Sequence, residues 1–222
     1  MLFALGQPFV FVGLLISFVL ALLLRSFAIR LSARALGLVD RRDAVTPRLR
    51  EDVDPFGAVA AAVGGPGWGK IIDVDEVPRF RGRARAALVF LAGPIVVVLA
   101  AQLALLAFRL SSADSLFFLR VSDLVRGQFD APIGIQVLLG LAGGLLAFGL
   151  IALLPMPPLD GFGVLWSAQR APGRGMQGYR LWFQEKNIGV VVLLACCFFP
   201  FSYPLILLPV DLLGTVFLRL WG

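Results

Sequence analysis

The sequence predicts an all-α polytopic integral membrane protein. Of its 222 residues, 59% are hydrophobic and 15% are charged, whereas soluble domains average about 45–50% apolar and about 25% charged residues. The mean hydropathy is +0.90. Four runs reach the ~18 mostly apolar residues that a membrane-spanning helix requires. We therefore treat residues 1–222 as one transmembrane domain, with spans at about residues 8–29, 86–108, 132–154 and 188–210.

The first apolar run does not resemble a cleaved signal peptide. Such a peptide begins with a basic region and ends at a small-residue cleavage site, but Met1 to Gln7 carry no charged side chain. We expect this run to be kept as a span. Its helix is predicted to continue through "RSFAIRLSARALG" and to end at Gly37, a typical C-terminal cap. Residues 38–56 then form a charged loop.

The segment at about residues 57–68 is apolar but too short to cross the ~30 Å hydrocarbon core as a helix. We expect a re-entrant or interfacial segment, followed by a basic loop over 70–85. The third span contains "LLGLAGGLLAFG", and small residues at such spacing allow helices to pack closely in lipid. Pro200, Pro204 and Pro209 interrupt the last apolar stretch. It is predicted to be either one kinked span with an interfacial helix or a tight hairpin.

The distribution of Lys and Arg predicts the orientation, because cytoplasmic loops carry an excess of these residues. Residues 25–85 hold 12 of the 20, residues 155–187 hold four, and residues 109–131 hold three. We expect the N-terminus outside and the loops at about 38–56, 70–85 and 155–187 in the cytoplasm, in the inner membrane of a bacterium. Nucleic-acid binding is not indicated, because the sequence has no dense basic face with interleaved aromatic residues.

Four arginines near the start of the second span alternate without acidic residues. They are candidates for contacts with anionic lipid head groups, and the alternative is that they only set the topology. They are Arg79, Arg81, Arg83 and Arg85.

Several short motifs occur in an order that resembles the site-2 protease family of intramembrane zinc metalloproteases. They cover roughly residues 10–210 and comprise "RSFAIRLSARALG", "DPFG" at 54–57, "GWGK" at 67–70, "LAGP" at 91–94 and "LLPMPPLDG" at 153–161. The resemblance implies a core of about four spans. It also implies a zinc site in which an H-E-x-x-H helix supplies two histidines and a glutamate base. The aspartate of L-D-G would be the third ligand, and zinc would activate a water molecule.

This chain departs from that pattern at the catalytic positions. The H-E-x-x-H window falls on "RSFAI", so Arg25 and Ile29 replace the histidines and Ser26 replaces the base. The whole sequence contains no histidine. Two asparagines that the family usually carries are replaced at Val97 and Ala152. Only Asp160 of the implied ligands remains.

Asp160 and Arg25 each have two open interpretations. Arg25 either pairs with Asp160 in the former metal position, by bidentate hydrogen bonding, or extends to the membrane interface at the end of its span. Asp160 either points into the former active site or caps a helix or turn. A water-bridged contact would also satisfy the pairing hypothesis.

The sequence therefore predicts a non-catalytic pseudoprotease that needs no cofactor or metal. We expect a structural or accessory subunit that binds another membrane protein of a larger complex, and lipids. Two alternatives remain open. One is an intramembrane protease with an unorthodox metal site. The other is a lipid- or pigment-binding module, which would lack histidine, the commonest side-chain ligand for such metals.

Overall fold

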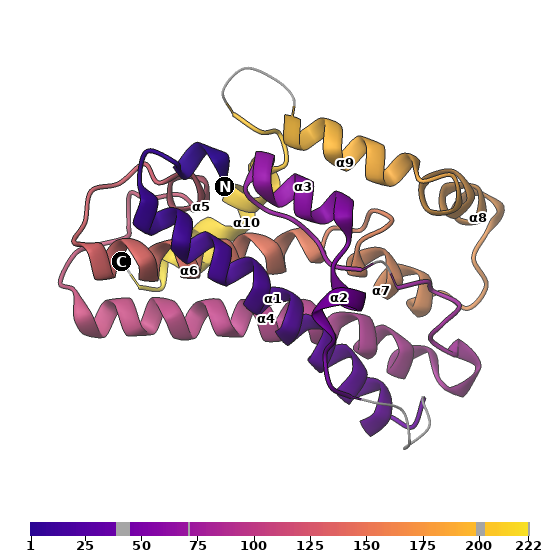
Figure 1. The fold of residues 1–222 in the computed structure, drawn as a ribbon. Helices are drawn as coiled ribbons and strands as arrows, with labels where there is room; N and C mark the ends of the chain where they lie inside the picture. Colours follow the sequence, from indigo (N-terminus) through magenta and orange to yellow (C-terminus); the bar gives the residue numbers. More distant parts are fainter. Residues whose placement is uncertain (39–44, 71, 199–202, 222) are drawn as a thin grey trace.

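The computed structural model describes residues 1–38, 45–70, 72–198 and 203–221, and these form an all-helical fold (Figure 1). Within them, extended pairing is limited to one isolated antiparallel bridge between Val53 and Gly69. The two loops that flank this bridge carry the "DPFG" and "GWGK" motifs, so the bridge holds the two motifs side by side.

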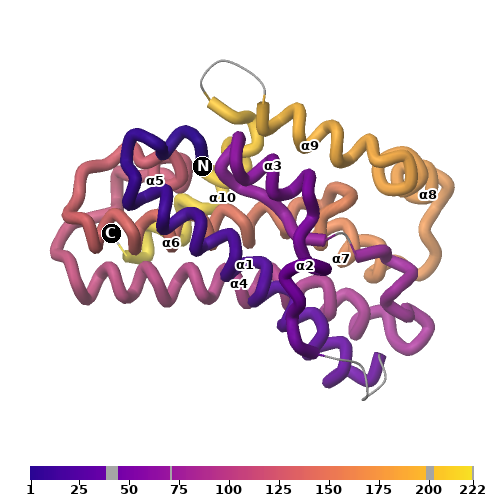
Figure 2. Tube along the Cα trace, viewed as in Figure 1, coloured from indigo at the N-terminus to yellow at the C-terminus, as the bar shows by residue number. Residues whose placement is uncertain are grey.

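Three long apolar helices form the centre of the molecule: α1 (Pro8–Ala35), α4 (Arg83–Ser111) and α6 (Ile133–Ala152). At 1.5 Å per residue they are about 42, 43 and 30 Å long, so each can cross a ~30 Å hydrocarbon core. They pack against one another, with α4 antiparallel to α1 and α6 (Figures 1 and 2). The ends at residues 35, 83 and 152 therefore share one side. Their length and composition indicate a membrane-embedded protein.

Glycines bring the backbones of α1 and α6 close together, as the small residues of the third span predict. A methyl group added at Gly13 would overlap the Val137 carbonyl oxygen, and one added at Gly140 would lie 2.7 Å from the Val10 carbonyl oxygen. Gly149 similarly faces α4, where an added methyl group would lie 2.7 Å from the Val98 side chain. Each glycine thus removes the side chain that would hold two helices apart.

Shorter helices lie around this three-helix core. They are α2 (Leu49–Asp52), α3 (Pro55–Gly64), α5 (Val121–Arg126), α7 (Asp160–Ala168), α8 (Arg174–Arg180), α9 (Ile188–Phe198) and α10 (Leu207–Arg219). Figure 1 shows α3 and α9 along one side of the core. Two 3-10 turns, Leu2–Ala4 and Arg79–Arg81, and a π-helical turn, Leu181–Glu185, complete the described helices.

The predicted re-entrant segment is the helix α3, which at ten residues is about 15 Å long. Asp54 caps its N-terminus by accepting a hydrogen bond from the Phe56 amide at 3.2 Å. The Trp68 indole donates to the second oxygen of the same carboxylate at 2.5 Å. Asp54 therefore holds the start of α3 against Trp68, in the chain that follows the helix. The helix is too short to cross the hydrocarbon core, and it packs against α9.

The last apolar stretch is not a single helix over 188–210. It begins as predicted with α9, but α9 ends at Phe198, and residues 199–202, including Pro200, lie outside the described chain. The chain then forms α10, which packs against α5 and α6 and buries Leu207, Val210 and Leu218. Before α9, the segment Arg174–Glu185 meets it at a 66° bend, and the two together are apolar enough for a broken span.

Candidate functional site

The side chains of Arg25 and Asp160 meet in a buried ion pair between α1 and the first turn of α7. Arg25 Nε donates to Asp160 Oδ2 at 2.6 Å, and Arg25 Nη2 donates to Asp160 Oδ1 at 2.5 Å. The two side chains are 6% and 2% exposed. The geometry is bidentate, so both oxygens of the carboxylate accept a guanidinium proton. Arg25 thus points into the protein rather than toward the membrane interface.

Two glycines from the family-like motifs make room for the Arg25 side chain. A methyl group at Gly93, in "LAGP", would lie 2.8 Å from Arg25 Cγ, and one at Gly69, in "GWGK", would lie 3.0 Å from Arg25 Nη1. Arg25 Nη1 also donates to the Lys70 carbonyl oxygen at 3.1 Å. The motifs that are separated in sequence therefore converge on the guanidinium group.

The two positions that the resemblance assigns to histidines share one face of α1. Ile29 follows Arg25 by four residues, about one helical turn, and a methyl group at Gly93 would lie 2.9 Å from Ile29 Cδ1. Ser26, at the position of the catalytic base, is buried as well. Of the two positions that the resemblance assigns to histidines, one thus holds a cation and the other an aliphatic side chain.

A tight elbow between α6 and α7 fixes the place of Asp160. The Pro157–Pro158 peptide bond in this elbow is cis. An added methyl group at Gly161 would overlap the Leu153 carbonyl oxygen, and one at Gly189 would overlap the Pro157 carbonyl oxygen. At Gly161 and Gly189 the backbone therefore lies too close to a neighbouring backbone segment for any side chain. This close approach accounts for the glycine of the L-D-G motif.

A second acid–base pair lies further along α1. Arg30 Nη2 donates to Asp52 Oδ1 at 2.5 Å, and the Arg48 amide donates to Asp52 Oδ2 at 2.8 Å. Asp52 is buried, whereas the Arg30 side chain is 29% exposed. The sequence analysis did not identify this pair, although the helical spacing of Arg25 and Arg30 placed both on the extension of α1.

The predicted lipid-binding arginines make protein contacts of their own. Arg79 Nη2 donates to the Gln169 and Arg170 carbonyl oxygens at 3.1 and 3.4 Å, Arg81 Nη1 to that of Gly37 at 3.2 Å, and Arg83 Nη1 to that of Ala168 at 3.4 Å. Arg79 and Arg83 thus lie at the C-terminus of α7, where cations are favourable. Arg85 is exposed. The predicted loops 70–85 and 155–187 therefore contact each other, and Arg81 also links the first of them to the end of α1.

The side chains at the Arg25–Asp160 site do not fit a catalytic zinc ion. Such a site needs about three protein ligands in a small volume, and the sequence has no histidine. Among the residues that the structure describes, no three Cys, Asp or Glu side chains lie close enough to hold a metal ion. Both oxygens of Asp160 are engaged by Arg25. What the arrangement does offer is a neutral, hydrogen-bonded link between α1 and α7.

Comparison of the chain with protein-family models, with curated proteins and with solved structures found no match.

Proposed function

We propose that the chain is a non-catalytic pseudoprotease with a site-2-protease-like core, which acts as a structural or accessory subunit of a larger membrane complex. The observation that carries this proposal is the Arg25–Asp160 ion pair. It joins a position aligned with a histidine ligand to the only retained ligand. The convergence of "GWGK" and "LAGP" on Arg25 supports the same alignment.

A guanidinium group in this place supplies the positive charge that a metal ion would supply. An unpaired carboxylate near hydrocarbon is costly, and bidentate pairing with arginine removes that cost while retaining the elbow that positions α7. An arginine in place of a metal ion thus preserves the architecture, and it leaves neither oxygen of Asp160 free. The site then has only a structural role.

The outer surface supports a role in binding other membrane subunits. Large apolar side chains on α9 and α10 are exposed, with Val191 at 63%, Leu212 at 78% and Val216 at 64%. In a membrane these faces contact lipid or an apolar helix of a partner. We place the complex in a bacterial inner membrane, with the N-terminus outside and the basic end, with the loops 38–56, 70–85 and 155–187, in the cytoplasm.

Purification in mild detergent tests the proposal. We expect the tagged chain to co-purify with a defined set of membrane subunits and to contain far less than stoichiometric zinc by elemental analysis. The double variant Arg25→Met with Asp160→Leu removes both charges together and replaces them with apolar side chains. Because the proposal gives the pair no chemical role, this variant should retain the same subunits.

The competing protease hypothesis predicts the opposite results. Stoichiometric zinc that is lost in Asp160→Leu, together with cleavage of a membrane-spanning reporter peptide by the wild type, would overturn the pseudoprotease assignment. A stable monomer without any co-purifying subunit would overturn the accessory role. The variant Arg85→Met, which changes an exposed arginine, controls for the loss of one positive charge.

A further inference from the structure

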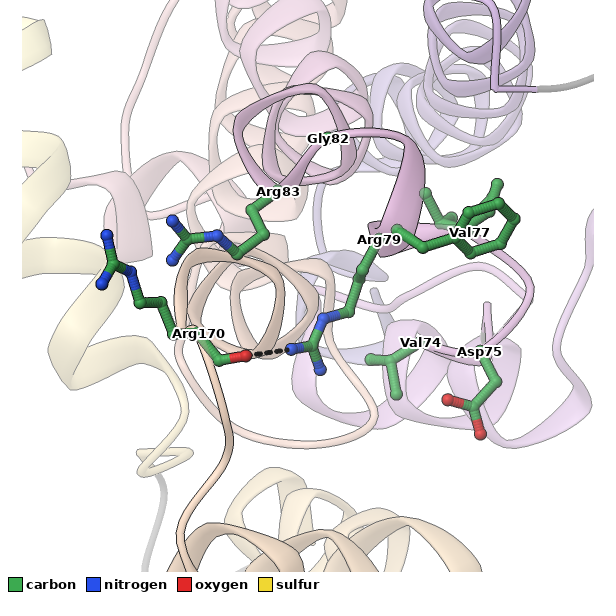
Figure 3. Close-up of a pocket in the computed structure, with 9 residues that line it drawn as sticks. Val74, Asp75, Val77, Arg79, Gly82, Arg83 and Arg170 are labelled. Carbon is green, nitrogen blue, oxygen red and sulfur yellow. Dashed lines mark hydrogen bonds between the residues drawn. The ribbon is translucent and has the colours of Figure 1, made fainter.

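A basic cavity of about 690 Å³ lies at the N-terminal end of α4, at the basic end of the molecule. Its wall includes Arg79 and Gly82 from the segment before α4, Arg83 from the first position of α4, and Arg170 from the chain after α7 (Figure 3). Asp75 also lines it. Arg180 Nη2 donates to the carboxylate of Asp75 at 2.6 Å and also to that of Asp73 at 3.2 Å. The lining itself thus carries three arginines and one acid.

Arg83 and Arg170 carry the hydrogen-bond donors that remain available. Arg79 is held in the wall, because its Nη2 binds the carbonyl oxygens after α7 and its guanidinium lies 5.6 Å from the centre of the Trp166 ring. Arg83 uses only Nη1, in a long bond of 3.4 Å. The Arg170 side chain donates to no group in the described residues, and Figure 3 shows it projecting to the same side of the cavity as Arg83.

The start of α4 adds a second attraction for an anion. Gly82 is the N-terminal cap of this 29-residue helix and offers no side-chain cap. The first amide groups of a helix lack intrahelical partners and carry the positive end of its dipole. Gly82 and Arg83 line the cavity, so the positive end of the α4 dipole adds to the charge of Arg83 and Arg170, a combination suited to a phosphate group.

The position of the cavity along α4 indicates which phosphate it binds. The helix is about 43 Å long and the hydrocarbon core about 30 Å thick, so roughly 6 Å of helix extends into the headgroup layer on each side. Phe80, also in the cavity wall, is 86% exposed. An exposed Phe beside basic residues is typical of segments that insert an apolar side chain at the headgroup boundary, which a water-soluble anion would not require.

We propose that this cavity binds the phosphate of an anionic phospholipid headgroup, held by Arg83 and Arg170, with Phe80 against the acyl chains. The site is independent of the Arg25–Asp160 pair. Of the four arginines predicted to contact lipid, only Arg79 and Arg83 line this cavity, and Arg79 is held in its wall by the carbonyl oxygens after α7.

Lipid titration of the detergent-purified full chain tests this site. We expect phosphatidylglycerol, but not phosphatidylcholine, to raise the melting temperature and to be retained in native mass spectrometry. Each interfacial arginine contributes about fivefold in affinity for anionic lipid. Arg83→Gln with Arg170→Gln should therefore weaken phosphatidylglycerol binding about thirtyfold, and Arg170→Gln alone about fivefold.

Matched variants distinguish this site from general charge effects. Arg109 and Arg174 are exposed and do not line the cavity, so Arg109→Gln with Arg174→Gln should bind phosphatidylglycerol like the wild type. An equal loss in this control would overturn the proposal. So would inorganic phosphate that stabilises the chain as strongly as phosphatidylglycerol. Phe80→Ser should weaken phosphatidylglycerol binding, and an unchanged affinity would contradict the acyl-chain contact.

Discussion

Replacing Arg25 by methionine should lower the free energy of unfolding by about 3–5 kcal/mol, the cost of leaving one partner of a buried ion pair alone. The side chains of Arg25 and Asp160 are 6% and 2% exposed, so the remaining carboxylate has little access to water. Asp160→Leu should be comparably destabilising, because it leaves the guanidinium unpaired. Unfolding of the detergent-solubilised chain by SDS titration, followed by circular dichroism, measures each change.

The double variant Arg25→Met with Asp160→Leu shows how much of the loss in stability comes from leaving one charge unpaired and how much from losing the ion pair itself. Replacing a whole buried ion pair by apolar groups of similar volume is often neutral or stabilising, so we expect most of the stability to return. Arg25→Lys keeps the charge but not the planar fork, and should be intermediate. Arg85→Met should change stability by less than about 0.5 kcal/mol, as for other exposed positions. Additive losses in the double variant would contradict direct coupling of the pair.

Gly13→Ala should cost about 1–2 kcal/mol by forcing α1 and α6 apart. The added methyl group overlaps the Val137 carbonyl oxygen and lies 2.9 Å from the Leu141 amide nitrogen. Both are backbone atoms that cannot rotate away. Overpacking usually costs about 1–3 kcal/mol, and alanine recovers at most about 1 kcal/mol through its higher helix propensity. The same SDS titration measures the difference.

Gly134 provides a control with the same chemical change. It belongs to α6, yet a methyl group added there would have no other atom within 4 Å. Gly134→Ala should therefore be neutral or slightly stabilising. If both variants behaved alike, close packing of α1 on α6 would not be the reason for glycine at position 13.

The long spans could be predicted from sequence because hydropathy over about 20 residues reflects a single physical requirement, the thickness of the hydrocarbon core. The predicted starts near 8, 86 and 132 lie within three residues of α1, α4 and α6. The close packing of the third span also followed from sequence, since small residues in a span allow helices to approach, whereas Gly13 of the first span was not singled out. The stretch 188–210 could not be resolved in this way, because the pairing of α10 with α5 and α6 depends on contacts distant in sequence.

Some contacts of the candidate site likewise could not be predicted from sequence and became evident only in the structure. The absence of histidine and the motif order pointed to Arg25 and Asp160, but not to the glycines that accommodate the arginine. Gly69 and Gly93 lay inside recognised motifs, and only their distances to Arg25 explain them. The carbonyl acceptors of Arg79 and Arg81 are distant in sequence, so these hydrogen bonds could not be predicted, and the lipid contacts of these two arginines stay a prediction.

The separation of Arg25 and Asp160 in the chain has a consequence for biosynthesis. The two residues are 135 positions apart, so α1 is made and inserted long before its counter-charge exists. During that interval the guanidinium lacks its partner, and an unpaired arginine favours the interface over hydrocarbon. The pair can form only after α7 has been made, so it belongs to a late step of folding and not to the insertion of α1.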